Sequence, residues 1–319
     1  MKTLKTNLGL LIEGITVDTP IKSSTPIDVK IVDLTDNERL VKVTETWDNL
    51  RVAIFNLYKD KKGTATMDDV KKEFKKEIKF LNENIKISDI NYSLENKCIK
   101  AKIGNLRVGQ LSTQNRKLLP NNLGQGFVIW NILGHISCNG KTKCCSSCCY
   151  NNCKSFGTHL RLKIDNLILS LLDIFGDVIK NLIELSPHVK TIVRIHEDGD
   201  FYDMTYYKKW EKISTENKNY QFEAYTKEPK LMEKINEINK TFDNLLLRFS
   251  IMEDTNQDIV KYVKENNLLT YVAIGTHKKD KNAKEVFEMI PQKNRCIGNC
   301  QFCKKCYSKE SVMIFTTIH

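Results

Sequence analysis

The sequence predicts an α/β fold in which repeated βα units form a partial barrel or an open parallel sheet, with a small α+β module before it. β-branched, apolar runs that are typical of strands begin near Phe127, Val189, Tyr220, Asn244 and Leu269. The last four begin about 25 to 30 residues apart, and helical patterns fill the intervals, which is typical of βαβ units. A doubly wound sheet has the same periodicity and stays open as an alternative.

The N-terminal module is predicted to span residues 1–119. Apolar positions recur at helical spacing over 48–59 and 67–84, and Thr66 is a good N-cap for the second of these helices. Residues 97–111 have the pattern of a strand pair. The order helix, helix, hairpin is shared by many small α+β folds, so it predicts no function by itself.

The second domain is predicted to span residues 120–319. Its helical patterns occupy 158–185, 203–215, 229–239, 255–266 and 283–289. In folds of this kind, the loops that follow the parallel strands gather at one edge, where functional sites are built. We therefore expect the segments that follow the strand candidates to lie close together.

Cysteine is the most informative residue type of the chain. Ten of the eleven cysteines fall in two short windows, 138–153 and 296–306, and only Cys98 lies elsewhere. A disulfide framework usually spreads its cysteines along a small secreted chain, whereas these are clustered in a large one. The clustering therefore predicts metal binding, and we expect Cys98 to be an inert thiol.

The spacing of the cysteines suggests which metal they bind. The run Cys300-x2-Cys303-x2-Cys306 presents three thiolates to one compact centre, as in ferredoxin-like iron–sulfur loops. Adjacent cysteines diverge, so one member of each neighbouring pair in the first window is expected to ligate. We predict iron–sulfur ligation, with a [4Fe–4S] cluster as the favoured type and tetrahedral zinc as the alternative. The predicted ligands are Cys138, Cys145, Cys149, Cys153, Cys296, Cys300, Cys303 and Cys306.

Positive charge accompanies both windows. Residues 138–163 and 292–309 each hold five basic residues and no acidic one, in a chain whose formal net charge is +11. Two interpretations remain open: compensation of metal-bound thiolates, and a surface that binds the phosphates of DNA or RNA. The second interpretation predicts that Lys141, Lys143, Lys304 and Lys305 contact phosphates.

The apolar residues give no sign of a membrane segment. No run is long enough to span a bilayer, and the apolar run near the N-terminus is too weak for a signal peptide. The sequence therefore predicts a cytoplasmic protein without a membrane partner.

Six motifs follow one another in residues 120–319. They are Gly124-Gln-Gly-Phe127; Cys138, Cys145, Cys149 and Tyr150; Arg194, His196, Gly199, Asp200 and Phe201; Tyr206 or Tyr207 and Trp210; Tyr225-Thr-Lys227; and Cys300, Cys303 and Cys306. In kind and in order these motifs resemble those of the gene product 88-like family of phages, plasmids and conjugative elements. The chain departs from the family's pattern in its extra cysteines, Cys144, Cys148 and Cys153, and in lacking a proline after Cys138. The resemblance implies a mobile-element origin and a metal, and it names no reaction.

A looser, topological similarity links the chain to radical S-adenosylmethionine enzymes, which place a cluster-binding cysteine loop after the first strand of a partial barrel. Here Cys145-x3-Cys149-x3-Cys153 is one residue longer than their C-x3-C-x2-C loop. By this similarity, Glu197, Gly199 and Ser250 are candidate residues for binding S-adenosylmethionine.

The segment after the second strand candidate holds the remaining candidates. His196 lies between Arg194 and Asp200 at a strand end, and the three are predicted as catalytic or second-sphere residues. A histidine on an apolar strand is also often a core residue, and Asp200 could instead cap the next helix. We expect His196 or Arg194 within about 10 Å of a ligating sulfur, since the strands are neighbours.

Together these patterns predict an iron–sulfur protein of a mobile genetic element that acts on or near nucleic acid. A radical S-adenosylmethionine-type enzyme and a zinc-stabilised binding protein without catalysis are the alternatives. The sequence does not decide whether the protein is an enzyme.

Overall fold

The fold was described from a computed structural model of the chain. The structure describes residues 38–61, 64–113, 125–138, 158–188, 190–252, 254–274, 285, 287–296 and 305–317. The predicted helix at 283–289 therefore falls only partly within the described residues.

Three helices open the described chain: α1 (Glu38–Asp60), α2 (Met67–Glu73) and α3 (Lys75–Asn84). Thr66 caps α2 as predicted, because its hydroxyl accepts the Asp69 N–H at 3.2 Å while the Asp69 carboxylate accepts the Thr66 N–H at 2.8 Å. This capping box satisfies two backbone donors at the helix start. The helix predicted over 67–84 is interrupted at Phe74, which ends α2 and precedes α3.

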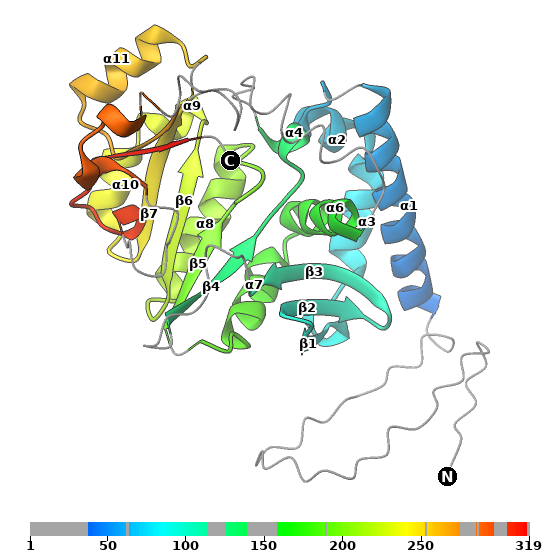
Figure 1. Ribbon diagram of the computed structural model, residues 1–319. Helices are drawn as coiled ribbons and strands as arrows, with labels where there is room; N and C mark the ends of the chain where they lie inside the picture. Colours follow the sequence, from blue (N-terminus) through cyan, green and yellow to red (C-terminus); the bar gives the residue numbers. More distant parts are fainter. Residues whose placement is uncertain are drawn as a thin grey trace.

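A nine-stranded open sheet runs through the molecule in the order of the chain, from β1 to β9 (Figure 1). The first four strands pair antiparallel, and β4 to β9 pair parallel, each with its predecessor. The sheet is not closed into a barrel, so of the two predicted forms it is the open sheet. The strands are β1 (Asn91–Glu95), β2 (Cys98–Ile103), β3 (Leu106–Ser112), β4 (Gln125–Trp130), β5 (Lys190–Ile195), β6 (Gln221–Thr226), β7 (Leu245–Ile251), β8 (Thr270–Ile274) and β9 (Met313–Thr317).

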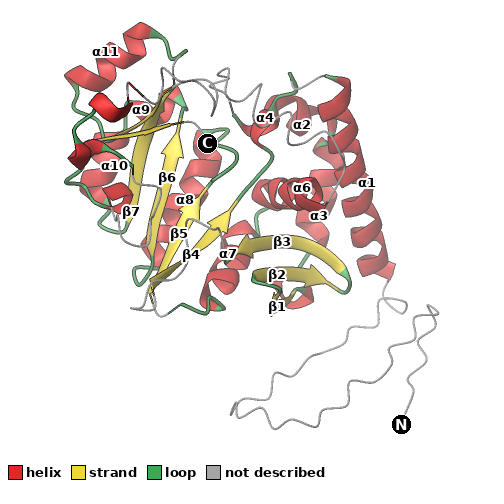
Figure 2. Ribbon diagram, in the orientation of Figure 1, coloured by secondary structure: helices red, strands yellow, loops and turns green. Residues whose placement is uncertain are grey.

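Helices lie between the parallel strands, as the alternating pattern predicted (Figure 2). They are α4 (Gly134–Ser137), α6 (Thr158–Leu171), α7 (Phe175–Glu184), α8 (Met204–Glu216), α9 (Pro229–Met232), α10 (Ile235–Thr241) and α11 (Gln257–Glu265). Crossovers between parallel strands are right-handed, and here each moves one strand in the same direction. The major helices therefore cover one face of the sheet.

The two faces of the parallel strands differ in chemistry. On the helix face, Trp130 packs against Phe175 and Trp210, with ring centroids 5.6 and 6.3 Å apart, inside one continuous apolar core. Because side chains alternate along a strand, the next residues point to the opposite face, which we call the loop face. It carries Phe127, Ile192, Arg194, Glu223, Tyr225, Arg248, Ser250 and Tyr271.

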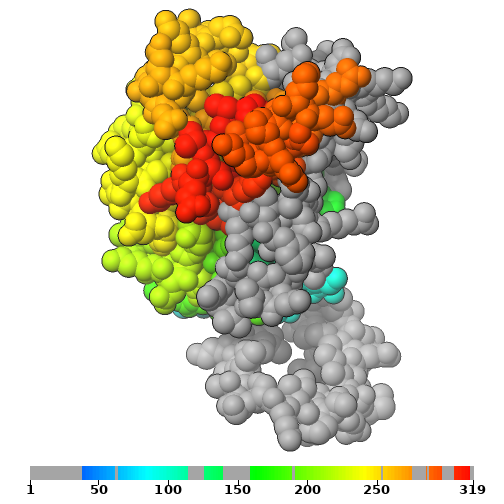
Figure 3. Space-filling view, turned by 60° about the vertical axis from the view of Figure 1, so that its left-hand side comes forward, coloured from blue at the N-terminus to red at the C-terminus, as the bar shows by residue number. Residues whose placement is uncertain are grey.

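The second cysteine window lies between β8 and β9 in the chain, because β9 begins only at Met313. The Cys296 N–H donates to the Phe315 carbonyl of β9 at 2.7 Å, and Arg295 forms a parallel bridge with the same residue. Residues 287–296 and 305–317 lie together on the surface shown in Figure 3. β9 thus anchors the start of this window.

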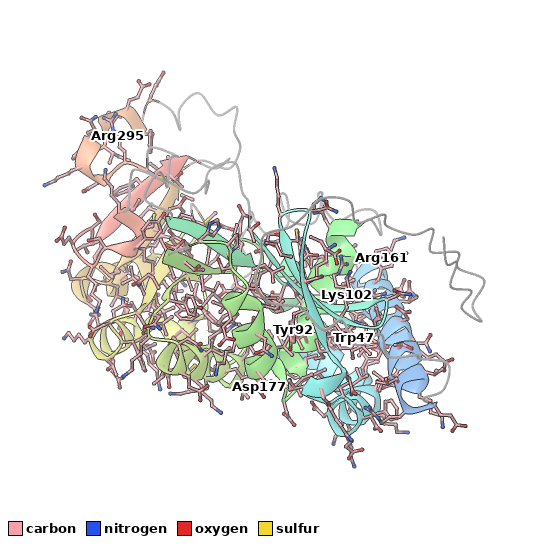
Figure 4. The ribbon with its side chains drawn as sticks, turned by 90° about the horizontal axis from the view of Figure 1, so that it is seen from below. Trp47, Tyr92, Lys102, Arg161, Asp177 and Arg295 are labelled. Carbon is pink, nitrogen blue, oxygen red and sulfur yellow. The ribbon has the colours of Figure 1, made fainter. Side chains whose placement is uncertain are left out.

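The N-terminal hairpin continues the same sheet, since Ser112 of β3 pairs with Ile129 of β4. A buried carboxylate strengthens this junction: Asp165 of α6 accepts hydrogen bonds from Trp47 (3.0 Å), Arg51 (2.6 Å) and Arg107 (3.1 Å). We call these four residues the Asp165 bracket. It joins α1, β3 and α6, and its Trp47 lies at the opposite end of the molecule from Arg295 (Figure 4).

Candidate metal centre

Three of the eight predicted cysteine ligands, Cys138, Cys296 and Cys306, belong to the described residues. Cys296 and Cys306 are free thiols, as is Cys98 on β2. The part of the chain that the structure describes contains no group of three or more metal-ligand side chains. The other predicted ligands, Cys145, Cys149, Cys153, Cys300 and Cys303, lie outside the described residues.

Cys306 is buried on the loop face of the sheet. Burial and the neighbouring charge of Glu223 raise the pKa of its thiol to about 12, while a hydrogen bond from the Tyr225 hydroxyl and the charge of Arg194 act against this shift. A metal ion competes with the thiol proton and stabilises the thiolate directly. Cys306 is thus a thiol whose surroundings already include groups that favour the ligating form.

Arg248 of β7 fixes the backbone around Cys306. Its guanidinium is 1% exposed and donates four hydrogen bonds to carbonyl oxygens of the segment 305–311. The Nε–H donates to Cys306 at 3.1 Å, and one terminal nitrogen donates to Ser308 at 2.6 Å. The planar, charged guanidinium suits such multiple contacts, which hold the end of the second cysteine window against the sheet.

Arg194 of β5 and Glu223 of β6 lie side by side in the strand register and form an ion pair, with Nη1 and Oε1 3.3 Å apart. The guanidinium also lies over the Tyr225 ring, 4.6 Å from its centroid. Burial opposes the charge of Arg194, but Tyr225, Glu223 and Cys306 together raise its pKa. The Nε of Arg194 and the Oε2 of Glu223 are buried without a hydrogen-bond partner.

The segment after Cys306 crosses the loop face as far as β4. Tyr307 packs on Phe127 with ring centroids 5.3 Å apart, and β4 leads into the first cysteine window. At the start of that window Cys138 is buried, and its N–H donates to the Gly134 carbonyl at 2.8 Å. The described end of the second window therefore contacts the sheet across its loop face, and Cys138 follows β4 by way of α4.

His196 follows β5 and turns away from the loop face. Strict alternation would place it beside Arg194, but its φ of +63° redirects the chain, and its ring packs on Phe201 and Tyr206 at 5.0 and 5.6 Å. Its Nε2 lies 2.9 Å from the Tyr206 hydroxyl, and burial lowers the pKa of the imidazole to about 3. These contacts give His196 a structural role, and its catalytic role stays a prediction.

Asp200 connects the loop after β5 to the end of β6. Its carboxylate accepts hydrogen bonds from the backbone N–H groups of Phe201 and Lys227 and from the Thr226 hydroxyl, each at 2.7 Å. The N-cap of α8 is Asp203, whose side chain accepts the Tyr206 N–H. Asp200 is thus a buried connector of two loops and does not cap the following helix.

Glu197 and Gly199 hold the loop after β5 against the segment that leads to Cys138. The backbone N–H of Glu197 donates to the Asn131 side chain at 2.7 Å. Gly199 has φ +102°, and an added Cβ would lie 2.5 Å from the side chain of Ile132. This loop therefore lies against residues 131–137, which lead to the first cysteine window. Its proximity to Cys145 and Cys149, which lie outside the described residues, stays a prediction. Whether these residues bind a cofactor stays a prediction.

Ser250 lies on the loop face of β7, two residues beyond Arg248, and is buried. Sequence analysis singled it out but missed Glu223 and Arg248, which surround Cys306 more directly. A charged residue inside an apolar strand is the one signal that could have indicated them. Arg248 stands in the run Leu-Leu-Leu-Arg-Phe-Ser-Ile, and such a residue is buried only when partners satisfy it.

Among the lysines predicted to contact phosphate, Lys305 is the described one. Its ammonium donates to the carbonyls of Gln292 and Arg295, at 3.1 Å each, and so links the two ends of the second window. Lys141, Lys143 and Lys304 lie outside the described residues. A DNA or RNA partner therefore stays a prediction. No described helix is long and apolar enough to cross a membrane.

The fold and these contacts define a class: an α/β protein with an open, mostly parallel sheet whose loop face receives a cysteine-bearing segment. Residues 95–309 match the family model described as gene product 88, so the chain belongs to the gene product 88 family. The match begins at β1, earlier than the boundary at residue 120 from which the motifs were recognised.

A curated relative is the Gene 88 protein of Mycobacterium phage L5, which is 27% identical over 133 residues. The alignment covers 40% of this chain and 54% of the phage protein, so the chain spans about half the length of the curated relative it matches. No solved structure matches the chain.

Proposed function

We propose that the chain is an iron–sulfur protein of a mobile genetic element, whose cluster is ligated by cysteines of the two windows. One observation carries the proposal: Cys306 is a free, buried thiol that the sheet holds in place through Arg248 and contacts through Tyr225. A hydrogen bond and a nearby cation are what a metal-bound thiolate needs from its surroundings. Lys305 also donates to the Arg295 carbonyl, so the residues that precede Cys296 and Cys306 are in contact.

The experiment is anaerobic purification of the full chain, followed by measurement of iron, zinc and acid-labile sulfide per chain. The proposal expects a brown protein with iron and sulfide in equal amounts, and the stoichiometry tells whether one or two clusters are present. Cys306→Ser should lower the iron content, and Cys98→Ser, which changes a free thiol outside both windows, should not. A colourless protein that contains stoichiometric zinc would overturn the iron–sulfur proposal and support a zinc-stabilised protein instead.

A second candidate function is a radical reaction with S-adenosylmethionine. The observation that favours it is the strand order: β4 to β9 are parallel and sequential, and the first cysteine window follows the first of these strands. The test is incubation of the reduced protein with S-adenosylmethionine and analysis for 5′-deoxyadenosine. Formation of this product by the native chain, and its loss in Cys149→Ala, would support the radical enzyme. An iron-loaded protein that releases no product would be a cluster protein without this activity.

Action on or near nucleic acid is the finer part of the proposal, and it is supported by the positive charge of the two windows. Binding to short DNA and RNA duplexes at several salt concentrations tests it, because contacts with phosphates weaken steeply as salt rises.

A further inference from the structure

Two buried polar atoms of the Arg194–Glu223 pair on the loop face have no hydrogen-bond partner. Arg194 uses one terminal nitrogen for Glu223, whereas its Nε–H, which is also buried, donates to nothing. A buried donor without an acceptor costs about 1–3 kcal/mol, so it is rarely left without a role. The neighbouring acceptor, Oε2 of Glu223, is unpaired as well.

The surroundings of Arg194 show which kind of acceptor is absent. The Tyr225 ring and Glu223 hold the guanidinium in place, and the charges of Arg194 and Cys306 act on each other. An ionised thiolate or an inorganic sulfide bound to a metal is an anionic acceptor, and it forms only when the metal arrives. The buried Nε–H of Arg194, whose charge acts on Cys306, would gain such an acceptor only when the metal is bound.

We infer that Arg194 is a positioning residue of the metal centre: its Nε–H and its charge serve the sulfur of Cys306 when that sulfur binds a metal. This inference rests on the proposed function, because it requires a metal in that window. Arg248 holds the backbone of Cys306, Tyr225 donates to its sulfur, and Arg194 supplies the second donor and the compensating charge. Glu223 fixes the orientation of Arg194 through the ion pair.

The test compares Arg194→Gln with Arg194→Lys in the full chain, purified anaerobically. The measurements are metal affinity by competition with a chelator and, for an iron–sulfur cluster, the midpoint potential. Loss of a residue that supports a ligand typically weakens metal binding about 10- to 100-fold, so we expect at least a tenfold loss in Arg194→Gln. The potential should become more negative, since the reduced cluster carries more negative charge and loses a nearby cation. Arg194→Lys should recover the potential and part of the affinity.

Arg107→Gln is the matched control. Arg107 and Arg194 have side chains of equal exposure, 20%, and each pairs with a buried carboxylate, but Arg107 belongs to the Asp165 bracket, which includes no cysteine. Arg107→Gln should lower the melting temperature and leave affinity and potential unchanged.

The possible failures are distinct. A native chain that binds neither iron nor zinc would overturn the proposed function and this inference together. A native chain that binds metal, with an affinity and a potential that Arg194→Gln does not alter beyond the Arg107→Gln control, would overturn the inference alone. In that case a buried water would be the partner of Nε, and the ion pair would be structural only.

Discussion

The Asp165 bracket and the Arg194–Glu223 pair are both buried, charged and built on neighbouring elements, yet they differ in completeness. In the Asp165 bracket both carboxylate oxygens accept hydrogen bonds, from Trp47, Arg51 and Arg107. In the Arg194–Glu223 pair one ion contact is made at 3.3 Å, and a donor and an acceptor stay unpaired. The fold by itself satisfies the carboxylate of Asp165, whereas it leaves one polar atom of Arg194 and one of Glu223 available to a further partner.

The largest expected effect on stability comes from removing the carboxylate of the Asp165 bracket. Asp165→Ala leaves Arg51 and Arg107 without their buried partner, and breaking such a pair costs about 3–5 kcal/mol of unfolding free energy. Chemical denaturation of the variant should show this loss, with the iron content of the protein that remains folded unchanged. A loss below about 1 kcal/mol would show that the bracket is not the main support of the junction.

The next prediction concerns Gly199, in the loop that follows β5. Gly199→Ala adds a Cβ 2.5 Å from Ile132 at a positive φ, and we expect a loss of about 1–3 kcal/mol of unfolding free energy. The matched control is Gly176→Ala in α7, where the nearest atom lies 4.0 Å away and alanine favours the helix by about 0.5–1 kcal/mol. Thermal unfolding should therefore shift in opposite directions, and equal shifts would contradict the close approach at Gly199.

The third prediction concerns the buried imidazole of His196, which packs on the helix side of β5. Its pKa is about 3 in the fold and 6.5 as a free side chain, so below pH 6.5 the unfolded chain binds the extra proton. Stability should fall as the pH decreases from 6.5 toward 3, by up to about 1.4 kcal/mol per pH unit from this group. His196→Gln should remove that part of the slope. An unchanged slope in His196→Gln would show that the imidazole is accessible to protons in the fold.

The smallest expected effect concerns the positive charge. Lys305→Gln should leave any affinity for DNA unchanged, because this ammonium already donates to two carbonyls of its own loop. Lys141→Gln, in contrast, should reduce the slope of log affinity against log salt by about one if the first window contacts phosphate. Binding isotherms at three salt concentrations decide this, and a reduced slope in Lys305→Gln would contradict a purely structural role.

Sequence patterns predicted the parallel strands and their helices well, because the spacing of apolar residues follows from which side chains face the core. They predicted the Phe74 break and the direction of His196 less well. A backbone dihedral such as φ +63° at His196 depends on the packing of Phe201 and Tyr206, which no local pattern records. Arg248 was missed because its partners, the carbonyls of 305–311, lie about 60 residues further along the chain, and a charged residue in a strand has no partner that hydropathy alone can identify.

The sequential strand order has a consequence for biosynthesis. Each strand from β5 onward pairs with the strand made just before it, so the sheet can extend strand by strand as the polypeptide leaves the ribosome. The guanidinium of Arg248 lacks its four carbonyl partners until residues 305–311 emerge. A nascent chain arrested before Lys305 would therefore have a largely formed sheet without the segment that buries Arg248.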